Sequence, residues 1–366
     1  MDRSKEIVKT SLVGVGVNLV LVAFKAGVGL VTGSIAVILD AVNNLSDALS
    51  SVITIVGTKL AGRRPDKKHP YGYGRIEYLT SMIIAVLVLL AGLTSLKESV
   101  EKIIHPEAAD YSLVSLIILA AGVAAKLLVG RYVKGRGEKL KSQALVASGS
   151  DALFDAILST ATLVAAGVSM LWGLSLEGIL GVIISGFIIK AGIEMLMEAL
   201  SSITGDRADK ALTEPLRELV ESYPQVHGAY DLSLHNYGPS TIIGSVHIEV
   251  DDAMTARQIH KLTRTISADV YQKFGVVLTV GVYASNDTDE EGQAIKQALE
   301  ELVTQTPEIL QVHGFYWDKS QRRAMFDLVV DFSADPKAVL EAVVSKLHER
   351  WPDVCFDPVL DSDVSD

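Results

Sequence analysis

The fold follows from one short stretch, Leu39-Asp40-Ala41-Val42-Asn43-Asn44-Leu45-Ser46-Asp47, which puts polar and acidic side chains inside a long apolar segment. Asn43 and Asp47 stand four residues apart, so they project from one face of a helix. A second apolar segment repeats this spacing with Asp151 and Asp155. Ionisable groups within a membrane helix are costly and mark ion or proton pathways. The sequence therefore predicts a cation site formed by two helices of a membrane protein.

The apolar segments are long enough to form membrane spans. A helix needs about 20 residues to cross the hydrocarbon layer, and six segments meet this length, at about 8–31, 35–60, 77–103, 111–133, 143–171 and 175–201. The connections at 61–76 and 131–142 are rich in lysine and arginine. Because positive loops stay on the cytosolic side, the pattern predicts a six-helix domain over residues 1–205 with both termini in the cytosol.

The charge balance changes after this domain. Residues 1–205 hold 19 lysines and arginines against 16 acids, whereas residues 206–366 hold 14 against 28. The acidic part is expected to be a separate, water-facing unit. The low isoelectric point and the lack of a basic stripe argue against nucleic acid as a partner. The single cysteine, Cys355, allows no internal disulfide.

The acidic part contains a repeat. Its hydrophobic pattern predicts helix-strand-strand-helix-strand over residues 206–285 and again over residues 286–366. The four residues Gln225-Val226-His227-Gly228 recur as Gln311-Val312-His313-Gly314, 86 residues later. We therefore expect two tandem α+β cytosolic domains of the αββαβ, ferredoxin-like or metallochaperone-like type. Both histidines of the repeated motif are interpreted as turn and packing residues and not as metal ligands.

The ligand set of the membrane site indicates which ion it binds. Asn43, Asp47, Asp151 and Asp155 offer only oxygen, and oxygen ligands suit hard divalent ions such as Mn²⁺ better than Zn²⁺. Three carboxylates exceed the charge of one divalent ion, so exchange of metal for protons is the expected mechanism. The alternative is that these groups only join helices through hydrogen bonds, which is common for asparagine. Asp40 is either an outer carboxylate of the pathway or a group facing water, and we favour the second.

These features resemble the cation diffusion facilitator family. The resemblance rests on the two intramembrane pairs, on the αββαβ domain and on the loop Arg64-Pro65-Asp66-Lys67-Lys68-His69-Pro70-Tyr71-Gly72-Tyr73-Gly74-Arg75-Ile76-Glu77, and it covers about residues 5–284. It implies a homodimeric, proton-coupled exporter of divalent metal that works by alternating access. The pairs Asn43/Asp47 and Asp151/Asp155 look like the manganese-type branch, since zinc-type members carry histidine there.

Other metal positions of the family are altered in this chain. A loop site would map onto Asp66 and His69, but the third position is Tyr73, and a phenol is a poor ligand at neutral pH. Of the cytosolic cluster only His247 remains, for which we favour a structural role. Lys126 and Lys190 are expected to snorkel towards the cytosolic ends of their helices, and Lys25 towards the outer face. Lys190 could also pair with Glu194.

The sequence thus predicts a multi-pass protein of the cytoplasmic membrane that exports a divalent metal, Mn²⁺ before Zn²⁺, Fe²⁺ or Co²⁺, with the lipid bilayer, protons and a second copy as partners. No enzymatic motif and no cofactor is expected. A membrane-anchored metal or ligand sensor is the alternative from another class.

Overall fold

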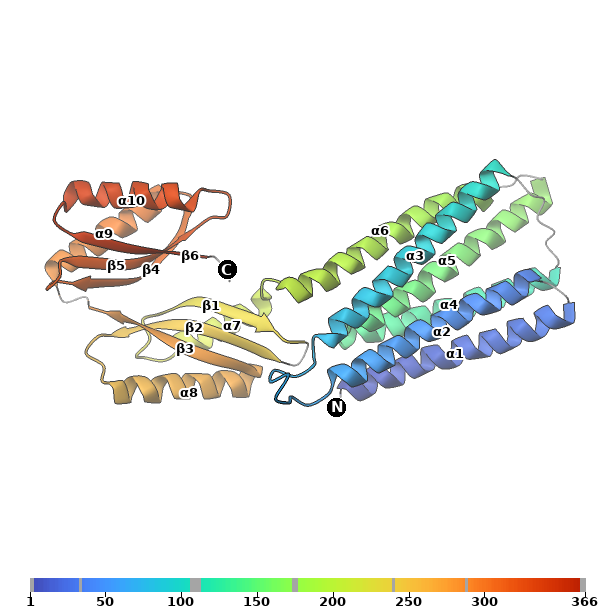
Figure 1. Ribbon diagram of the computed structural model, residues 1–366, viewed down its shortest axis with the longest axis horizontal. Coiled ribbons are helices and arrows are strands. Elements are labelled where there is room, and N and C mark those ends of the chain that lie inside the picture. The colour runs from blue at the N-terminus through green and yellow to red at the C-terminus, as the bar shows by residue number, and fades with distance from the viewer. Residues whose placement is uncertain are drawn as a thin grey trace. The chain divides into compact units, whose positions relative to one another are not determined.

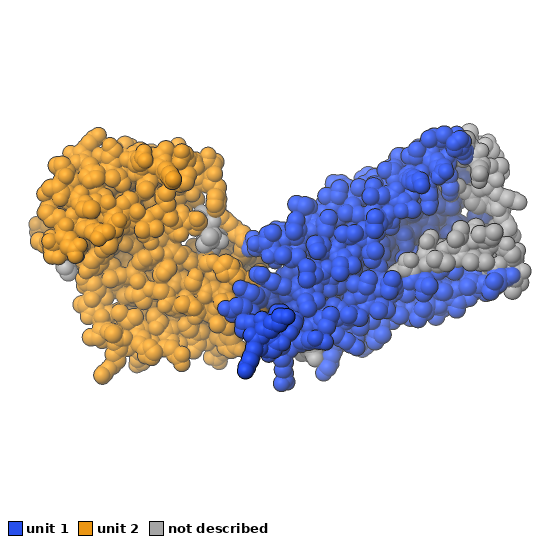
Figure 2. All heavy atoms as spheres, viewed as in Figure 1, with its two compact units in different colours: residues 1–206, 237–240 blue, residues 207–236, 241–366 orange. Residues whose placement is uncertain are grey.

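The computed structural model describes most of the chain, namely residues 3–32, 35–105, 113–172, 177–238, 241–286 and 289–362. The chain divides into two compact units (Figure 2). Unit 1 comprises residues 1–206 with 237–240, and unit 2 comprises residues 207–236 with 241–366. This division falls where the sequence changes from apolar to acidic.

Unit 1 is a bundle of long helices (Figure 1). Each helix has between 27 and 30 residues, which at about 1.5 Å per residue exceeds the roughly 30 Å hydrocarbon thickness of a bilayer. Among the described residues, four helices, α1, α3, α4 and α6, are both long and apolar enough to cross a membrane. The other two, α2 and α5, carry the pairs Asn43/Asp47 and Asp151/Asp155. The bounds are α1 (Arg3–Thr32), α2 (Ile35–Ala61), α3 (Ile76–Ile104), α4 (Leu113–Lys139), α5 (Gln143–Trp172) and α6 (Glu177–Thr204).

The helices of unit 1 pack mainly in pairs, α1 with α2, α3 with α6 and α4 with α5. Small residues allow the close approach that membrane helices use for packing. A Cβ atom on Gly149 of α5 would come within 2.4 Å of the Lys134 backbone nitrogen on α4, and one on Gly181 of α6 within 2.1 Å of the Ser99 hydroxyl on α3. Glycine at these positions therefore sets the spacing of two helix pairs.

The outward faces of the bundle are apolar. Val20, Leu128 and Phe187 are 68%, 73% and 67% exposed. Large exposed apolar surfaces of this kind mark contact with a membrane or a partner. Polar residues lie inside instead, as in the hydrogen bond from the Ser185 hydroxyl to the Ser95 hydroxyl at 3.0 Å.

Unit 2 contains the order helix, strand, strand, helix, strand twice (Figure 1). The first set is α7 (Lys210–Glu221), β1 (Gly228–Asn236), β2 (Ile242–Asp251), α8 (Ala256–Phe274) and β3 (Val276–Ser285), and the second is α9 (Glu290–Gln305), β4 (Ile309–Asp318), β5 (Arg323–Val330), α10 (Pro336–Arg350) and β6 (Cys355–Asp361). In each sheet the first two strands are antiparallel and the last two are parallel. Each set has its own buried apolar core.

The helix ends of unit 2 are fixed by local hydrogen bonds. Asp209, Thr255, Asp289 and Asp335 cap four helices by accepting from backbone N–H groups of the first turn. The first strand of each sheet contains a bulge, between Tyr230 and Ser233 in β1 and between His313 and Tyr316 in β4. A bulge changes the direction in which side chains point.

Candidate metal centre

A buried lysine on α4 lies between two aspartates from different helices. The Nζ atom of Lys126 is 2.9 Å from Oδ2 of Asp47 on α2 and 2.7 Å from Oδ2 of Asp155 on α5. Lys126 is only 6% exposed, so both ion pairs are largely shielded from water. Because buried charges are stable only with partners, this contact ties three helices together.

A third carboxylate belongs to the same electrostatic group. Asp151 lies one helical turn before Asp155 on α5, and its charge interacts with those of Asp155, Asp47 and Lys126. The four groups carry three negative charges and one positive charge when all are ionised. The structure thus directs Asp47 and Asp155 at one cation and places Asp151 within electrostatic range of it.

The remaining polar residues of the opening motif lie on α2. The side chains of Asn43 and Asp40, both predicted from sequence, fall outside the described residues. Asn44 is fully buried, and in the described part of the chain neither of its amide atoms has a hydrogen-bond partner. Because Asn44 precedes Asp47 by three residues, both project from one side of α2. Asn44 therefore offers a further side-chain oxygen on the side of α2 that carries Asp47. The sequence analysis did not include Asn44 among the candidate ligands.

The lysines correct two sequence predictions. Lys126 was expected to snorkel out of its span, but it is buried between Asp47 and Asp155. Lys25 is also buried, at 2% exposure, and its Nζ is 3.3 Å from where a Cβ on Gly122 of α4 would lie, so it does not snorkel either. Lys190 is 73% exposed and pairs with Glu194 at 3.6 Å.

The position of Lys126 follows from the α4–α5 hairpin. The turn between these helices is centred near Lys141, which has a positive φ of 50°. Lys126 lies 15 residues before Lys141, and Asp155 lies 14 residues after it. Antiparallel helices joined by a short turn bring residues equally distant from that turn to the same height. Counting from the turn in the sequence would have identified this pair.

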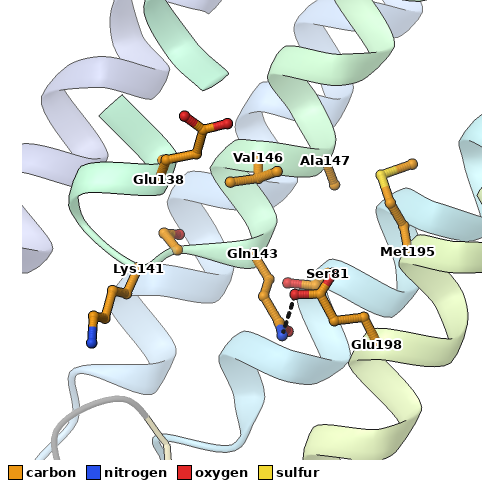
Figure 3. A pocket seen from close by; sticks show the side chains of 10 residues that line it. Ser81, Glu138, Lys141, Gln143, Val146, Ala147, Met195 and Glu198 are labelled. Carbon is orange, nitrogen blue, oxygen red and sulfur yellow. Dashed lines mark hydrogen bonds between the residues drawn. The ribbon is translucent and has the colours of Figure 1, made fainter. Parts of the chain in front are cut away.

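A pocket of about 440 Å³ opens beside the start of α5 (Figure 3). Gln143, Val146 and Ala147 line it from α5, and Glu198 lines it from α6, where its Oε1 accepts from Gln143 Nε2 at 3.2 Å. Ala147 lies one helical turn before Asp151, so α5 runs from the pocket towards the acidic residues.

The loop between α2 and α3 uses its acidic residue for its own structure. Asp66 Oδ1 accepts from the backbone N–H of Lys68 and His69 at 2.9 and 2.7 Å, and Oδ2 accepts from the Tyr73 hydroxyl at 2.7 Å. The Tyr73 and His69 hydrogen bonds hold the pKa of Asp66 below its usual value. Both carboxylate oxygens of Asp66 thus already accept hydrogen bonds from within the loop.

His247, the other secondary candidate, lies on β2 in unit 2. Its Nδ1 is 2.8 Å from Oδ2 of Asp231, and its side chain is 40% exposed. The ring lies over Gly281, where a Cβ would come within 2.0 Å of the imidazole. His247 therefore has a carboxylate partner, which fits the structural role that the sequence favoured.

Comparison with known proteins gives two family matches. The cation efflux transmembrane domain matches residues 11–204, more than half of the chain. The cytoplasmic domain of cation efflux proteins matches residues 208–282. Neither match extends over residues 283–366, which contain the second αββαβ set.

Several individual proteins are similar over 70–75% of the chain. An uncharacterised transporter of Methanocaldococcus jannaschii is 28% identical over 70% of this chain and 91% of its own length. The manganese efflux system protein MneS of Bacillus subtilis is 28% identical over 75% of this chain and 96% of its own length. The magnetosome protein MamM of Magnetospirillum gryphiswaldense is 27% identical over 74% of this chain and 86% of its own length.

Proposed function

The chain belongs to the cation efflux family, whose members are transporters and not enzymes, and on this premise we propose that it exports a divalent metal ion in exchange for protons. The family match confirms the resemblance inferred from the sequence. One observation carries the proposal: Asp47 and Asp155, from two different helices, converge on a single buried cationic group, Nζ of Lys126. A pair of carboxylates held in this way is suited to a metal ion that displaces the ammonium group.

The charges of the site determine how many protons are exchanged for one metal ion under this proposal. Asp47, Asp151 and Asp155 carry three negative charges, and Lys126 offsets one of them. The group is then neutral when it holds one divalent ion. The empty group has a net charge of about −2, so it reaches neutrality by taking up about two protons. Metal binding then releases these protons from the ligands. The site predicted from sequence, with Asn43 and three aspartates, would keep one surplus negative charge when it holds a divalent ion. The charge of Lys126 removes this surplus.

The proposed ion is Mn²⁺. Asn43, Asp47, Asp151 and Asp155 supply oxygen ligands without imidazole or thiolate, and such ligands suit Mn²⁺. One of the similar proteins is named as a manganese efflux protein. Export of Zn²⁺, Fe²⁺ or Co²⁺ through the same residues is the nearest alternative.

The proposed path begins at the pocket beside α5. Glu138 and Glu198 line this pocket together with Lys141, so its lining carries one net negative charge when all three are ionised. Asp151 follows Ala147 of the pocket lining by one turn, so a cation that enters there needs to advance about one turn of helix to reach the first carboxylate. The basic connections at this end of the helices support a cytosolic position for the pocket.

The proposal also extends to assembly and location. The match to the family's cytoplasmic domain supports a homodimer in the cytoplasmic membrane, with six spans and with both termini in the cytosol. Alternating access to the two membrane faces is the proposed transport cycle. Residues 206–285 and 286–366 are proposed to be two copies of one domain, supported by the repeated element order.

Transport by purified protein in sealed vesicles tests the proposal. Mn²⁺ uptake driven by a proton gradient is expected for the unchanged chain and should fall at least about tenfold in Asp47→Asn and in Asp155→Asn, since each removes one charged ligand. Glu194→Gln is the matched control, because Glu194 is an exposed carboxylate on α6 that pairs with the exposed Lys190. Transport of Zn²⁺ but not Mn²⁺ would overturn the choice of ion. Full activity of both aspartate variants would overturn the site.

A further inference from the structure

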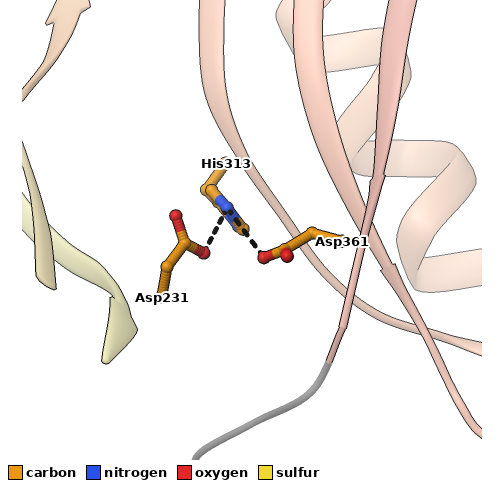
Figure 4. Close-up of side chains that lie close together, drawn as sticks. All are labelled: Asp231, His313 and Asp361. Atoms are coloured by element: carbon orange, nitrogen blue, oxygen red, sulfur yellow. Dashed lines mark ion pairs between the residues drawn. The ribbon is translucent and has the colours of Figure 1, made fainter. Parts of the chain in front are cut away.

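A second cluster of ligand-type side chains lies in unit 2, between the two αββαβ sets (Figure 4). His313 on β4 points between Asp231 on β1 and Asp361 on β6. Its Nε2 is 2.7 Å from Oδ1 of Asp231 and 3.8 Å from Oδ2 of Asp361. One ligand atom from each of the three residues lies within 4.8 Å of the others. Three potential metal ligands therefore converge from three strands.

His313 is the unusual member of this cluster. Its side chain is completely buried, and in the described structure neither ring nitrogen has a partner with hydrogen-bond geometry, in spite of the short approach to Asp231. The ring is stacked on Tyr230 at 5.0 Å and lies against Tyr283 at 5.6 Å. Buried polar groups almost always have partners, and an ion absent from the coordinates is one explanation for an exception. The aromatic rings fix the imidazole so that Nε2 faces the two carboxylates.

The backbone on both sides of the cluster is shaped to bring these groups together. Asp231 has a positive φ of 54° within the bulge of β1. Gly314 follows His313 with a φ of 63°, and a Cβ there would come within 3.0 Å of the Tyr283 ring. Left-handed backbone at a residue other than glycine is uncommon and persists only where the surrounding structure supports it.

The cluster holds more negative charge than its partners balance. A third carboxylate, Asp327, is 3.9 Å from Nε2 of His313. The Tyr283 hydroxyl is 2.6 Å from Oδ2 of Asp231 and 2.7 Å from Oδ2 of Asp327, but a phenol carries one hydrogen and can donate to only one of them. Among the described residues no lysine or arginine forms an ion pair with Asp231, Asp327 or Asp361. In the described part of the chain, the ion-pair partners of these carboxylates are His247 and His313.

We propose that Asp231, His313 and Asp361 bind a divalent transition-metal ion that links the two αββαβ sets of unit 2. One imidazole nitrogen with carboxylate oxygens suits a transition metal such as Zn²⁺ better than Mg²⁺ or Ca²⁺, which prefer oxygen alone. Ligands at about 2.1 Å from a tetrahedral ion lie roughly 3.4 Å from each other. The two distances from His313 Nε2, 2.7 and 3.8 Å, lie on either side of this value.

This site is separate from the transport site and goes beyond the proposed function. Two of its ligands, His313 and Asp361, lie in the part of the chain that the family matches do not cover. Asp231 belongs to the first αββαβ set, and the other two ligands belong to the second. The ion would therefore bind with an affinity that depends on how the two sets are held together in unit 2.

Zn²⁺ binding to the full-length protein in detergent tests the proposal. Asp155→Asn serves as the background, because it removes a ligand of the transport site. In that background we expect about one Zn²⁺ per chain by equilibrium dialysis and elemental analysis, with a rise in melting temperature. Adding Asp361→Asn or His313→Gln should weaken this binding at least about tenfold, since each removes a ligand. Mg²⁺ in excess should not displace the Zn²⁺.

The matched control is His227→Gln. His227 occupies the same Gln-Val-His-Gly motif in the first αββαβ set but is exposed. The control should bind Zn²⁺ as the background does. Asp361 is about one-third exposed, so Asp361→Asn is expected to fold even if the change at buried His313 disturbs the core. Unchanged Zn²⁺ affinity in folded Asp361→Asn, or displacement by Mg²⁺, would overturn the proposal. All variants share the Asp155→Asn background. The difference in Zn²⁺ affinity between them therefore does not depend on whether the proposed transport site is correct.

Discussion

At the scale of single residues, Lys126 distinguishes the proposed transport site from a set of four oxygen ligands. Its ammonium group balances one of three carboxylate charges. We predict that Lys126→Gln raises the number of protons released per bound metal from about two to about three, because the empty site then takes up one more proton and all three carboxylates lose their protons on binding the ion, which leaves the loaded site with one net negative charge. Calorimetric titration with Mn²⁺ in buffers of different ionisation enthalpy measures this number directly.

Lys190→Gln provides the control for this prediction. Lys190 lies on α6, is 73% exposed and pairs with Glu194, so its removal should leave the proton number unchanged. Mn²⁺ should also bind more tightly to Lys126→Gln, since no ammonium group competes for Asp47 and Asp155. An equal proton number in the Lys126 variant and the unchanged chain would show that Lys126 does not contribute to the charge balance of metal binding.

The metal preference is also decided at this scale. Asn43→His and Asp151→His each introduce an imidazole, which favours Zn²⁺ over Mn²⁺. We predict a shift in the ratio of Zn²⁺ to Mn²⁺ transport of at least about tenfold, or roughly 1.4 kcal/mol. Vesicle transport with each ion alone measures the ratio. His247→Gln, a change far from the spans in sequence, should leave the ratio as it is.

Some of these residues could be found from the sequence, and others could not. The i,i+4 spacing of Asp47 and Asp155 with their partners is visible because both pairs interrupt apolar segments. Lys126 was missed because a lysine alone in a span is compatible with snorkelling. His313 was interpreted as a packing residue because its motif is identical to that of exposed His227, and only the folded structure shows that its imidazole is buried beside carboxylates.

At the scale of helices, the α4–α5 contact determines where Lys126 and Asp155 meet. Gly149 on α5 lies against the Lys134 backbone on α4, and an added Cβ would approach it to 2.4 Å. We predict that Gly149→Ala separates the two helices, destabilises the protein by about 1–3 kcal/mol and lowers transport. Thermal unfolding in detergent and vesicle transport are the measurements.

Gly135→Ala is the matched control on α4. A Cβ at Gly135 would meet no atom within 4 Å, and alanine has the higher helix propensity. The control should therefore be as stable as the unchanged chain or slightly more stable. Equal stability and transport in the Gly149 variant would mean that the close helix contact is not required.

The elements themselves were easier to predict than their pairing. Apolar length located the helices of unit 1 to within a few residues, and alternating patterns located the strands of unit 2. The pairing of α3 with α6 could not be predicted, because lipid-facing and buried positions of a membrane helix are both apolar. Steric contacts at glycines such as Gly181 decide that pairing, and they become visible only in the structure.

At the scale of the whole molecule, the chain combines a family transporter with an additional acidic αββαβ set. Residues 206–366 carry 28 acids against 14 basic residues, while the connections at 61–76 and 131–142 of unit 1 are basic. The basic loops are the basis for placing both termini in the cytosol. The acidic part would then lie on the side from which metal ions are taken up, where negative charge raises the local concentration of cations.

The single cysteine allows this orientation to be tested without altering the chain. Cys355 is exposed on β6 in unit 2. If residues 206–366 are cytosolic, a maleimide that cannot cross membranes should label Cys355 in inside-out vesicles but not in intact cells. His105→Cys combined with Cys355→Ser is the control, because His105 is exposed at the far end of α3 from the basic loop. That variant should show the opposite pattern. Labelling of Cys355 in intact cells would reverse the proposed orientation and, with it, the direction in which the ion is exported.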